Sequence, residues 1–196
     1  MQNDHCWIET YCGKKINPFD PHPEDIKLLD IAHALSMKCR FVGHCRSFYS
    51  IARHSINVYN YIESPALRVW GLFHDAAEAY FVDIARPMKK YFQIRYAGLP
   101  DGVESFEYVE HNLLDCIGDR LGIGHYTKLS VDDLRTIKQA DDVMLATEAV
   151  HFWGEAQIKE WSLTEKRTAF SSVNFSTKPE QDKAEFLDIC LRELEL

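Results

Sequence analysis

Residues 65–81 read PALRVWGLFHDAAEAYF, and this stretch decides the fold. If it is coiled into a helix, apolar side chains fall on nearly every side, a pattern typical of a central buried helix. We therefore predict one helix through the whole stretch, with His74, Asp75 and Glu78 inside it. Because burying polar groups without partners is costly, the protein must supply partners for these three side chains.

The sequence on either side predicts further helices and no sheet. Apolar residues recur at helical spacing, and neither strand-like alternation nor an internal repeat is present. Three prolines within 13–23 indicate an extended loop that closes a short N-terminal arm. A length of 196 residues favours a single all-α domain, a helical bundle over 1–196. The segments expected to be helical are 23–36, 48–62, 103–121, 131–153 and 180–195.

Charge and hydropathy limit the classes of partner. Lys and Arg number 22 against 30 Asp and Glu, and the resulting net charge of −8 disfavours binding to nucleic acid polymers. No stretch reaches the roughly 18 apolar residues of a membrane span, and the first residues lack the pattern of a signal peptide. We expect a cytoplasmic protein that does not bind membranes.

Polar residues from three predicted helices form a candidate metal site. His74 and Asp75 offer an imidazole nitrogen and a carboxylate oxygen, ligands that suit a divalent ion such as Zn, Mn, Co or Fe. Asp141 falls in the apolar stripe of its helix, whereas Asp142 points about 100° away and is expected to be solvated. His54 shares the apolar side of its own helix. The alternative is a hydrogen-bonded network of these side chains without a metal.

The order of these residues matches a known signature. His54, then His74 with Asp75, then Asp141 resembles the H…HD…D pattern of the HD-domain metal-dependent phosphohydrolases. The resemblance implies an all-α HD domain in which these four residues are the metal ligands. It implies Zn, Co or Mn as the cofactor, with Mg as an option at a second site.

Longer blocks of sequence narrow this resemblance. The pair Arg40-Phe41, the block HDAAEAYFVDIARPMK at 74–89 and the block KQAD at 138–141 are similar to the bacterial 5′-deoxynucleotidase branch. The stretch from Trp7 to about Trp153 is similar to small phage-encoded relatives, which include the viral dATP triphosphohydrolases.

Catalytic and substrate-binding roles follow from the resemblance. Glu78 and Asp83 match the acidic pair that follows the HD motif, and a carboxylate beside a metal-bound water can orient that water or accept its proton. For Asp83, capping of a helix end or loop is an equal alternative. Arg40 corresponds to the family's phosphate-contacting Arg, and Phe41 stands where relatives carry an aromatic residue beneath the sugar.

Two lysines are further candidates for phosphate binding. Lys89 follows the Arg86-Pro87 turn, and Lys138 lies three residues before Asp141 on the same predicted helix. For both lysines a solvated surface charge is the default alternative. Arg53 departs from the family pattern, because relatives usually have Glu immediately before the first His of the signature.

The expected activity is hydrolysis of a deoxyribonucleotide at the phosphorus nearest the sugar. The phage-like blocks favour dATP, together with dADP and dAMP, giving deoxyadenosine plus triphosphate or phosphate. One alternative is a 5′-deoxynucleotidase that accepts only monophosphates, and another is a non-catalytic module that binds metal or nucleotide. Homo-oligomers are common in the family, so we expect self-association.

Overall fold

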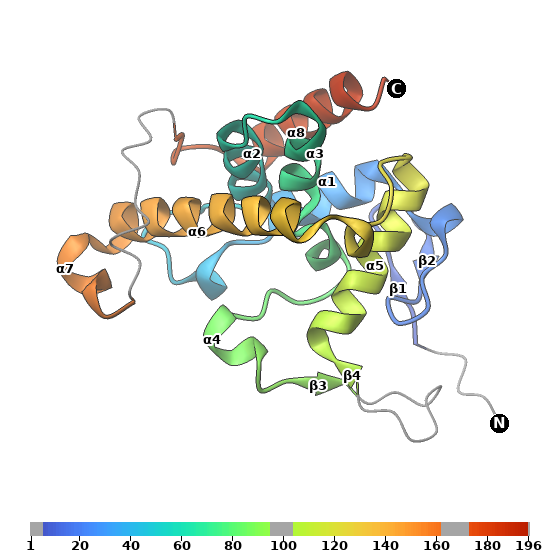
Figure 1. Cartoon of the computed structure of the whole chain (residues 1–196), viewed down its shortest axis with the longest axis horizontal. Helices are drawn as coiled ribbons and strands as arrows, with labels where there is room; N and C mark the ends of the chain where they lie inside the picture. Colours follow the sequence, from blue (N-terminus) through green and yellow to red (C-terminus); the bar gives the residue numbers. More distant parts are fainter. Residues whose placement is uncertain (1–5, 95–103, 162–172, 196) are drawn as a thin grey trace.

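The protein is a helical bundle, which confirms the all-α prediction, and its computed structural model describes residues 6–94, 104–161 and 173–195 (Figure 1). Short 3₁₀ turns and two-residue strands join the helices. The α-helices are α1 Leu28–Met37, α2 Ile51–Tyr61, α3 Pro65–Phe73, α4 Arg86–Lys89, α5 Phe106–Leu121, α6 Val131–Trp153, α7 Glu155–Ile158 and α8 Pro179–Glu193. The 3₁₀ turns are η1 Pro23–Asp25, η2 Phe41–Gly43, η3 Ala76–Ala79, η4 Tyr126–Lys128 and η5 Lys159–Trp161.

Two short pairs of antiparallel strands interrupt the helical pattern of the described residues. Strands β1 (Ile8–Glu9) and β2 (Lys15–Ile16) pair in the N-terminal arm, and β3 (Gln93–Ile94) pairs with β4 (Glu104–Ser105). The β2 strand lies inside the segment predicted as an extended loop, and Ile16 is buried. That single apolar anchor explains why a segment without strand alternation still pairs with its neighbour.

Helix α2 lies at the centre of the bundle. It packs against α1, α3, α6 and α8, and every residue from Ile51 to Tyr59 is buried. Ser50 caps its first turn by accepting a hydrogen bond from the Arg53 backbone N–H. Hydrophobic burial on all sides therefore fixes α2 and, with it, the position of His54.

The long helix α6 begins and ends where the sequence predicts. Ser130 accepts a hydrogen bond from the backbone N–H of Asp133, whose carboxylate accepts one from the Ser130 N–H in return. The helix ends before Gly154, which has a φ of 81° that favours glycine. With 23 residues it spans about 35 Å, and Figure 1 shows it running from near the middle of the molecule to α7 at the left-hand edge.

The predicted continuous helix over 65–81 is wrong. Helix α3 ends at Phe73, a turn carries His74 and Asp75, and the chain resumes as η3. The last carbonyls of a helix lack intrahelical partners, and the His74 ring donates from Nδ1 to one of them, the Gly71 carbonyl at 2.8 Å. This side-chain contact holds the HD pair at a helix end rather than in a helix interior.

Arg53 holds the last helix, α8, against the bundle. Its Nε donates to Asp182 at 2.9 Å and its Nη2 to Glu185 at 2.5 Å, both on α8. The hydroxyl of Ser50 donates to the other oxygen of the fully buried Asp182. A positive charge at this position therefore holds α8 against α2, where Figure 1 shows the two helices packed together.

Among the described residues, no helix is both long enough and apolar enough to cross a bilayer.

Candidate metal centre

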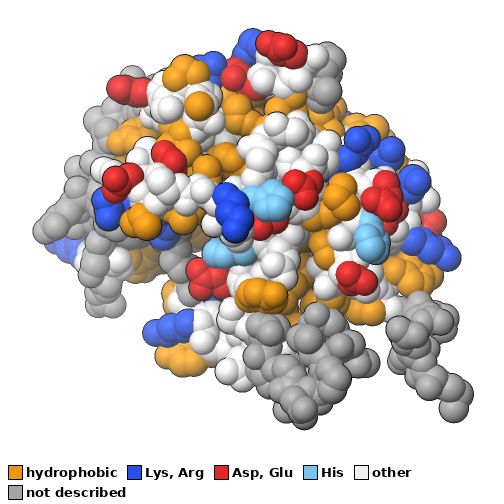
Figure 2. Space-filling model, turned by 45° about the vertical axis from the view of Figure 1, so that its right-hand side comes forward, with side chains coloured by type: hydrophobic (Ala, Val, Ile, Leu, Met, Phe, Trp, Pro, Cys, Tyr) orange, Lys and Arg blue, Asp and Glu red, His pale blue; other side chains and the backbone are white. Residues whose placement is uncertain are grey.

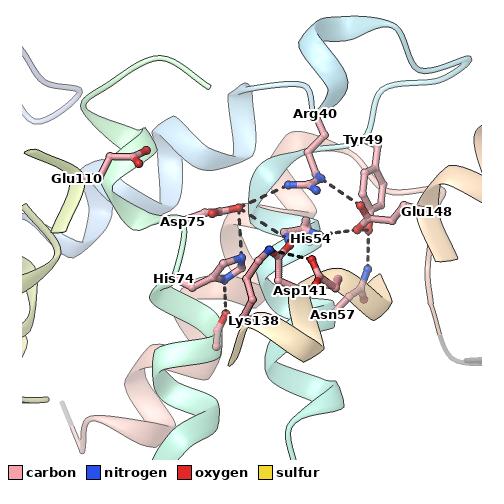
Figure 3. Close-up of polar contacts among 12 residues, drawn as sticks. Arg40, Tyr49, His54, Asn57, His74, Asp75, Glu110, Lys138, Asp141 and Glu148 are labelled. Atoms are coloured by element: carbon pink, nitrogen blue, oxygen red, sulfur yellow. Dashed lines mark hydrogen bonds and ion pairs between the residues drawn. The ribbon is translucent and has the colours of Figure 1, made fainter. Parts of the chain in front are cut away.

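Three side chains from three helical segments converge on one point (Figure 3). One ligand atom from each of His54 on α2, His74 after α3 and Asp141 on α6 lies within 4.8 Å of the other two, a cluster that could hold a metal ion. The Asp75 Oδ2 atom lies 3.8 Å from His54 Nε2 and 3.3 Å from His74 Nε2. The structure thus brings together all four residues that the signature predicts as ligands.

The second nitrogen of each imidazole is already engaged. His54 Nδ1 lies 2.7 Å from Glu148 Oε1, and His74 Nδ1 lies 2.8 Å from the Gly71 carbonyl oxygen. Because both oxygens only accept hydrogen bonds, both Nδ1 atoms carry the proton, which leaves the Nε2 lone pairs free for an ion. Metal-bound histidines are oriented in the same way.

Both Nε2 atoms are buried and have no hydrogen-bond partner within 6–94, 104–161 and 173–195. They face carboxylates instead, with His54 Nε2 at 3.3 Å from Asp141 Oδ1. Lone pairs that face one another across such a distance repel unless a cation or a proton lies between them. Burial and Arg40 oppose protonation of His54, yet the carboxylates of Glu148 and Asp141 raise its pKa to about 8. The cluster therefore attracts positive charge.

Asp75 is ionised for the same electrostatic reason. Burial opposes its ionisation, but the neighbouring His74 and His54 rings hold the pKa of its carboxyl far below the ordinary range. Arg40 adds an ion pair, with Nη1 at 3.5 Å from Asp75 Oδ2. A permanently charged carboxylate is the form that binds a metal.

Glu148, which the sequence did not single out, contacts the candidate metal cluster through His54. It is fully buried on α6 and accepts hydrogen bonds from Tyr49 Oη at 2.8 Å, Arg40 Nε at 3.1 Å and His54 Nδ1. Figure 3 shows contacts from Glu148 to both Arg40 and His54, so one carboxylate orients both. Although burial opposes ionisation, His54 and Arg40 keep the pKa of Glu148 below its ordinary value. The available signal was its spacing, since Glu148 follows Asp141 by seven residues, two turns along the same face.

We expect Glu148→Gln to lower the affinity for a divalent ion by about 10- to 100-fold, the usual cost of losing a carboxylate behind a metal-bound His. A neutral amide is a weaker acceptor for the His54 proton, so the ring becomes less basic and less firmly oriented. Calorimetric titration with Mn²⁺, Co²⁺ and Zn²⁺ measures the change. Glu180→Gln, on the exposed side of α8, is the matched control. Equal affinities in the two variants would contradict the role of Glu148.

Arg40 is positioned by the start of α2. Its backbone N–H donates to the Tyr49 carbonyl at 2.9 Å, and its own carbonyl accepts from Gly43 at 3.1 Å. The turn between them places Phe41 and Val42 at φ values of 54° and 53°, a left-handed conformation that non-glycine residues rarely adopt. This strained turn directly follows Arg40, whose guanidinium points toward the cluster.

The predicted acidic pair lies beside the cluster. Glu78 reaches it from η3 and not, as predicted, from the same continuous helix as His74. Its Oε2 is buried without a hydrogen-bond partner among the described residues, and burial followed by Asp75 and Asp83 raises its pKa. Lys38 fixes this segment, because its Nζ donates to the backbone carbonyls of Glu78 and Phe81. Burial also raises the pKa of the half-buried Asp83.

The cluster opens into a cleft of about 1420 Å³. Figure 2 shows histidine, acidic and basic side chains gathered near the middle of one face, with hydrophobic side chains around them. The predicted site residues that line the cleft are Arg40, Phe41, His74, Asp75, Glu78, Asp83, Lys89, Lys138 and Asp141. His54 lies beneath it, fully buried.

Both candidate lysines are in the cleft and both are ion-paired. Lys89 lies 2.8 Å from Glu110, whose pKa burial raises to about 7 despite this pairing. Lys138 lies 3.1 Å from Asp141 and 2.8 Å from Asp142. The expectation of a solvated Asp142 is wrong: only 7% of its surface is exposed, because α6 is covered on that side as well.

The sequence matches no family model. It is 33% identical over 142 residues to "Uncharacterized protein YfdR" of Escherichia coli strain K12. The aligned region covers 72% of this chain and 70% of YfdR. It is also 29% identical over 156 residues to "Uncharacterized protein RCAP_rcc00048" of Rhodobacter capsulatus, covering 76% of this chain and 74% of that protein. By this identity and coverage, the chain belongs to the YfdR family.

Proposed function

We propose that the protein is a metal-dependent phosphohydrolase of the HD type that hydrolyses deoxyribonucleotides. One observation carries the proposal: two buried imidazoles present free Nε2 atoms to the carboxylates of Asp75 and Asp141. Two nitrogen and two oxygen donors suit Zn, Co or Mn, with Mg as an option at a second site. A bound divalent ion lowers the pKa of its water and polarises a phosphoryl oxygen.

The chain's own groups divide the remaining tasks. The Arg40 guanidinium, held at Nε by Glu148, offers its outer N–H groups to a phosphate. The free Oε2 of Glu78 is available to orient the attacking water and to take its proton. Phe41 lies next to Arg40 in the cleft, where its ring can pack beneath a sugar and exclude a 2′-hydroxyl by bulk. Lys89 and Lys138 supply positive charge to a longer phosphate chain.

We expect dATP to be the preferred substrate and the attack to occur at the phosphorus nearest the sugar. The test is a product assay with dATP, dADP, dAMP and ATP, each with added Mn²⁺, Co²⁺ or Zn²⁺ and each repeated with excess chelator. Release of deoxyadenosine and intact triphosphate from dATP, lost with chelator and much slower from ATP, is the expected result.

Other outcomes of this assay identify the alternatives. Phosphate released from dAMP with dATP untouched would indicate a monophosphate-specific 5′-deoxynucleotidase. Tight metal or nucleotide binding with no product from any substrate would contradict the enzymatic proposal and indicate a binding module.

A further inference from the structure

The cleft has an aromatic end beside its polar end. We use "aromatic end" for Phe41, Trp153 and Trp161, which line the same cleft as the metal cluster. The ring centroids of Phe41 and Trp153 are 4.9 Å apart and nearly perpendicular, and those of Trp153 and Trp161 are 5.6 Å apart. Three large rings thus form one continuous wall.

Direct contacts connect this wall to the metal cluster. Asp75 is paired with Arg40 at 3.5 Å, and the Arg40 guanidinium carbon lies 5.3 Å from the centre of the Phe41 ring. Trp153 and then Trp161 continue beyond Phe41. Along the cleft, the order is therefore charged cluster, guanidinium, first ring, indole and second indole.

Helix α6 fixes the spacing of the two ends. It carries Asp141 at the charged cluster and Trp153 at its last residue, so their backbones are about 18 Å apart along the axis. Side chains on a helix lean toward its N-terminus, which brings the Trp153 indole back toward the cluster. The intervening Leu145 also lines the cleft, so its floor is apolar between the two ends.

The outer indole is open to solvent. Trp161 is 45% exposed, whereas Trp70, in the core of the bundle, is 3% exposed. An indole exposed inside a cleft, with other aromatic rings behind it, is typical of a surface that a ligand covers. Because charge and apolar rings are ordered along one cleft, the ligand should be charged at one end and flat and apolar at the other.

We propose that the aromatic end binds the nucleobase of the substrate by stacking, with Trp161 as the outer platform and Trp153 as its support. This inference rests on the proposed function, because it assumes a nucleotide whose phosphate lies at Arg40 and whose sugar lies over Phe41. A purine gains more from stacking than a pyrimidine because its ring area is larger. Stacking tolerates many bases, so the aromatic end favours purines without reading individual base edges.

The test compares a ligand with a base and one without. Binding of dAMP and of 2-deoxyribose 5-phosphate is measured by calorimetry in excess chelator, so that no turnover occurs, for wild type and Trp161→Ala. We expect about a 10- to 100-fold loss of dAMP affinity in the variant, the usual effect of removing a stacking ring, and unchanged affinity for the baseless sugar phosphate. Trp161→Phe should restore most of the dAMP affinity.

Trp7→Ala is the matched control, since Trp7 is similarly exposed and lies outside this cleft. Equal losses for both ligands, or no loss for dAMP, would overturn the inference. So would dissociation of an oligomer on Trp161→Ala with dAMP affinity unchanged, which would make the indole an interface residue. If dAMP binding depends on the base but no substrate is hydrolysed, the proposed activity is wrong and the base site is supported. If hydrolysis occurs and does not depend on Trp161, the base site is wrong and the proposed activity is supported.

Discussion

Asp75→Asn is expected to reduce the proposed hydrolysis of dATP by at least about 10³-fold. The substitution keeps the size of the side chain and removes the charge that a divalent ion needs, and metal catalysis is worth several kcal/mol of barrier, about tenfold in rate for each 1.4 kcal/mol. Initial rates at saturating Mn²⁺, followed by release of deoxyadenosine, measure the effect. The same variant should bind Mn²⁺ more weakly in a calorimetric titration. This second measurement does not depend on which substrate the protein hydrolyses.

The control for this change is Asp132→Asn, on the same helix as Asp141 but with an 84% exposed side chain. Its rate and metal affinity should match the wild type. The Asp75 variant should fold, because Arg40 keeps its hydrogen bond to Glu148. A folded Asp75→Asn protein that retains a tenth or more of the wild-type rate, or full metal affinity, would show that Asp75 is not a ligand.

Asp182→Ala is expected to lower the free energy of unfolding by about 3–5 kcal/mol, because it leaves Arg53 buried without its inner partner. Asp182 is fully buried, lies 2.8 Å from the Arg53 guanidinium and accepts the Ser50 hydroxyl. Its removal also leaves the buried Ser50 hydroxyl without an acceptor for its proton. Urea or guanidinium unfolding followed by circular dichroism measures the change.

Asp188→Ala provides the comparison, because Asp188 lies on the exposed side of the same helix. It should change stability by no more than about 0.5 kcal/mol. A loss below about 1 kcal/mol in Asp182→Ala would mean that α8 is held by its apolar residues alone. Since His54 follows Arg53 directly, the destabilised variant should also bind metal more weakly.

Local sequence signals predicted much of the fold and the site. Ser130 and the apolar period that follows it defined α6 to the residue, and the apolar faces of the helices brought His54, His74 and Asp141 together. The break after Phe73 could not be predicted in this way, because HDAAEAY suits a helix and the contact that ends it, from His74 to Gly71, forms only in the fold.

Contacts between distant residues escaped prediction for a different reason. The partner of Arg53 is 129 residues away on α8, and nothing near either residue indicates the other. Asp142 was predicted to be solvated because the sequence of one helix reveals only its main apolar stripe. Whether its other sides are buried depends on the segments that pack against it, and in the fold Asp142 is buried. Glu148 lies two helical turns after Asp141 on the same face of α6. Its role could not be predicted from that spacing, because its partners Tyr49 and Arg40 lie about 100 positions earlier in the chain.

Arg40 is shared between the carboxylates of Asp75 and Glu148. An ion that neutralises Asp75 weakens its hold on the guanidinium and frees that group to meet an incoming anion. Thermodynamic linkage then requires the converse, with the anion raising the affinity for the ion by an equal factor. The order in which the two ligands arrive consequently does not alter the final occupancy. If the proposed activity holds, removing the metal lowers the affinity for the substrate as well as the rate.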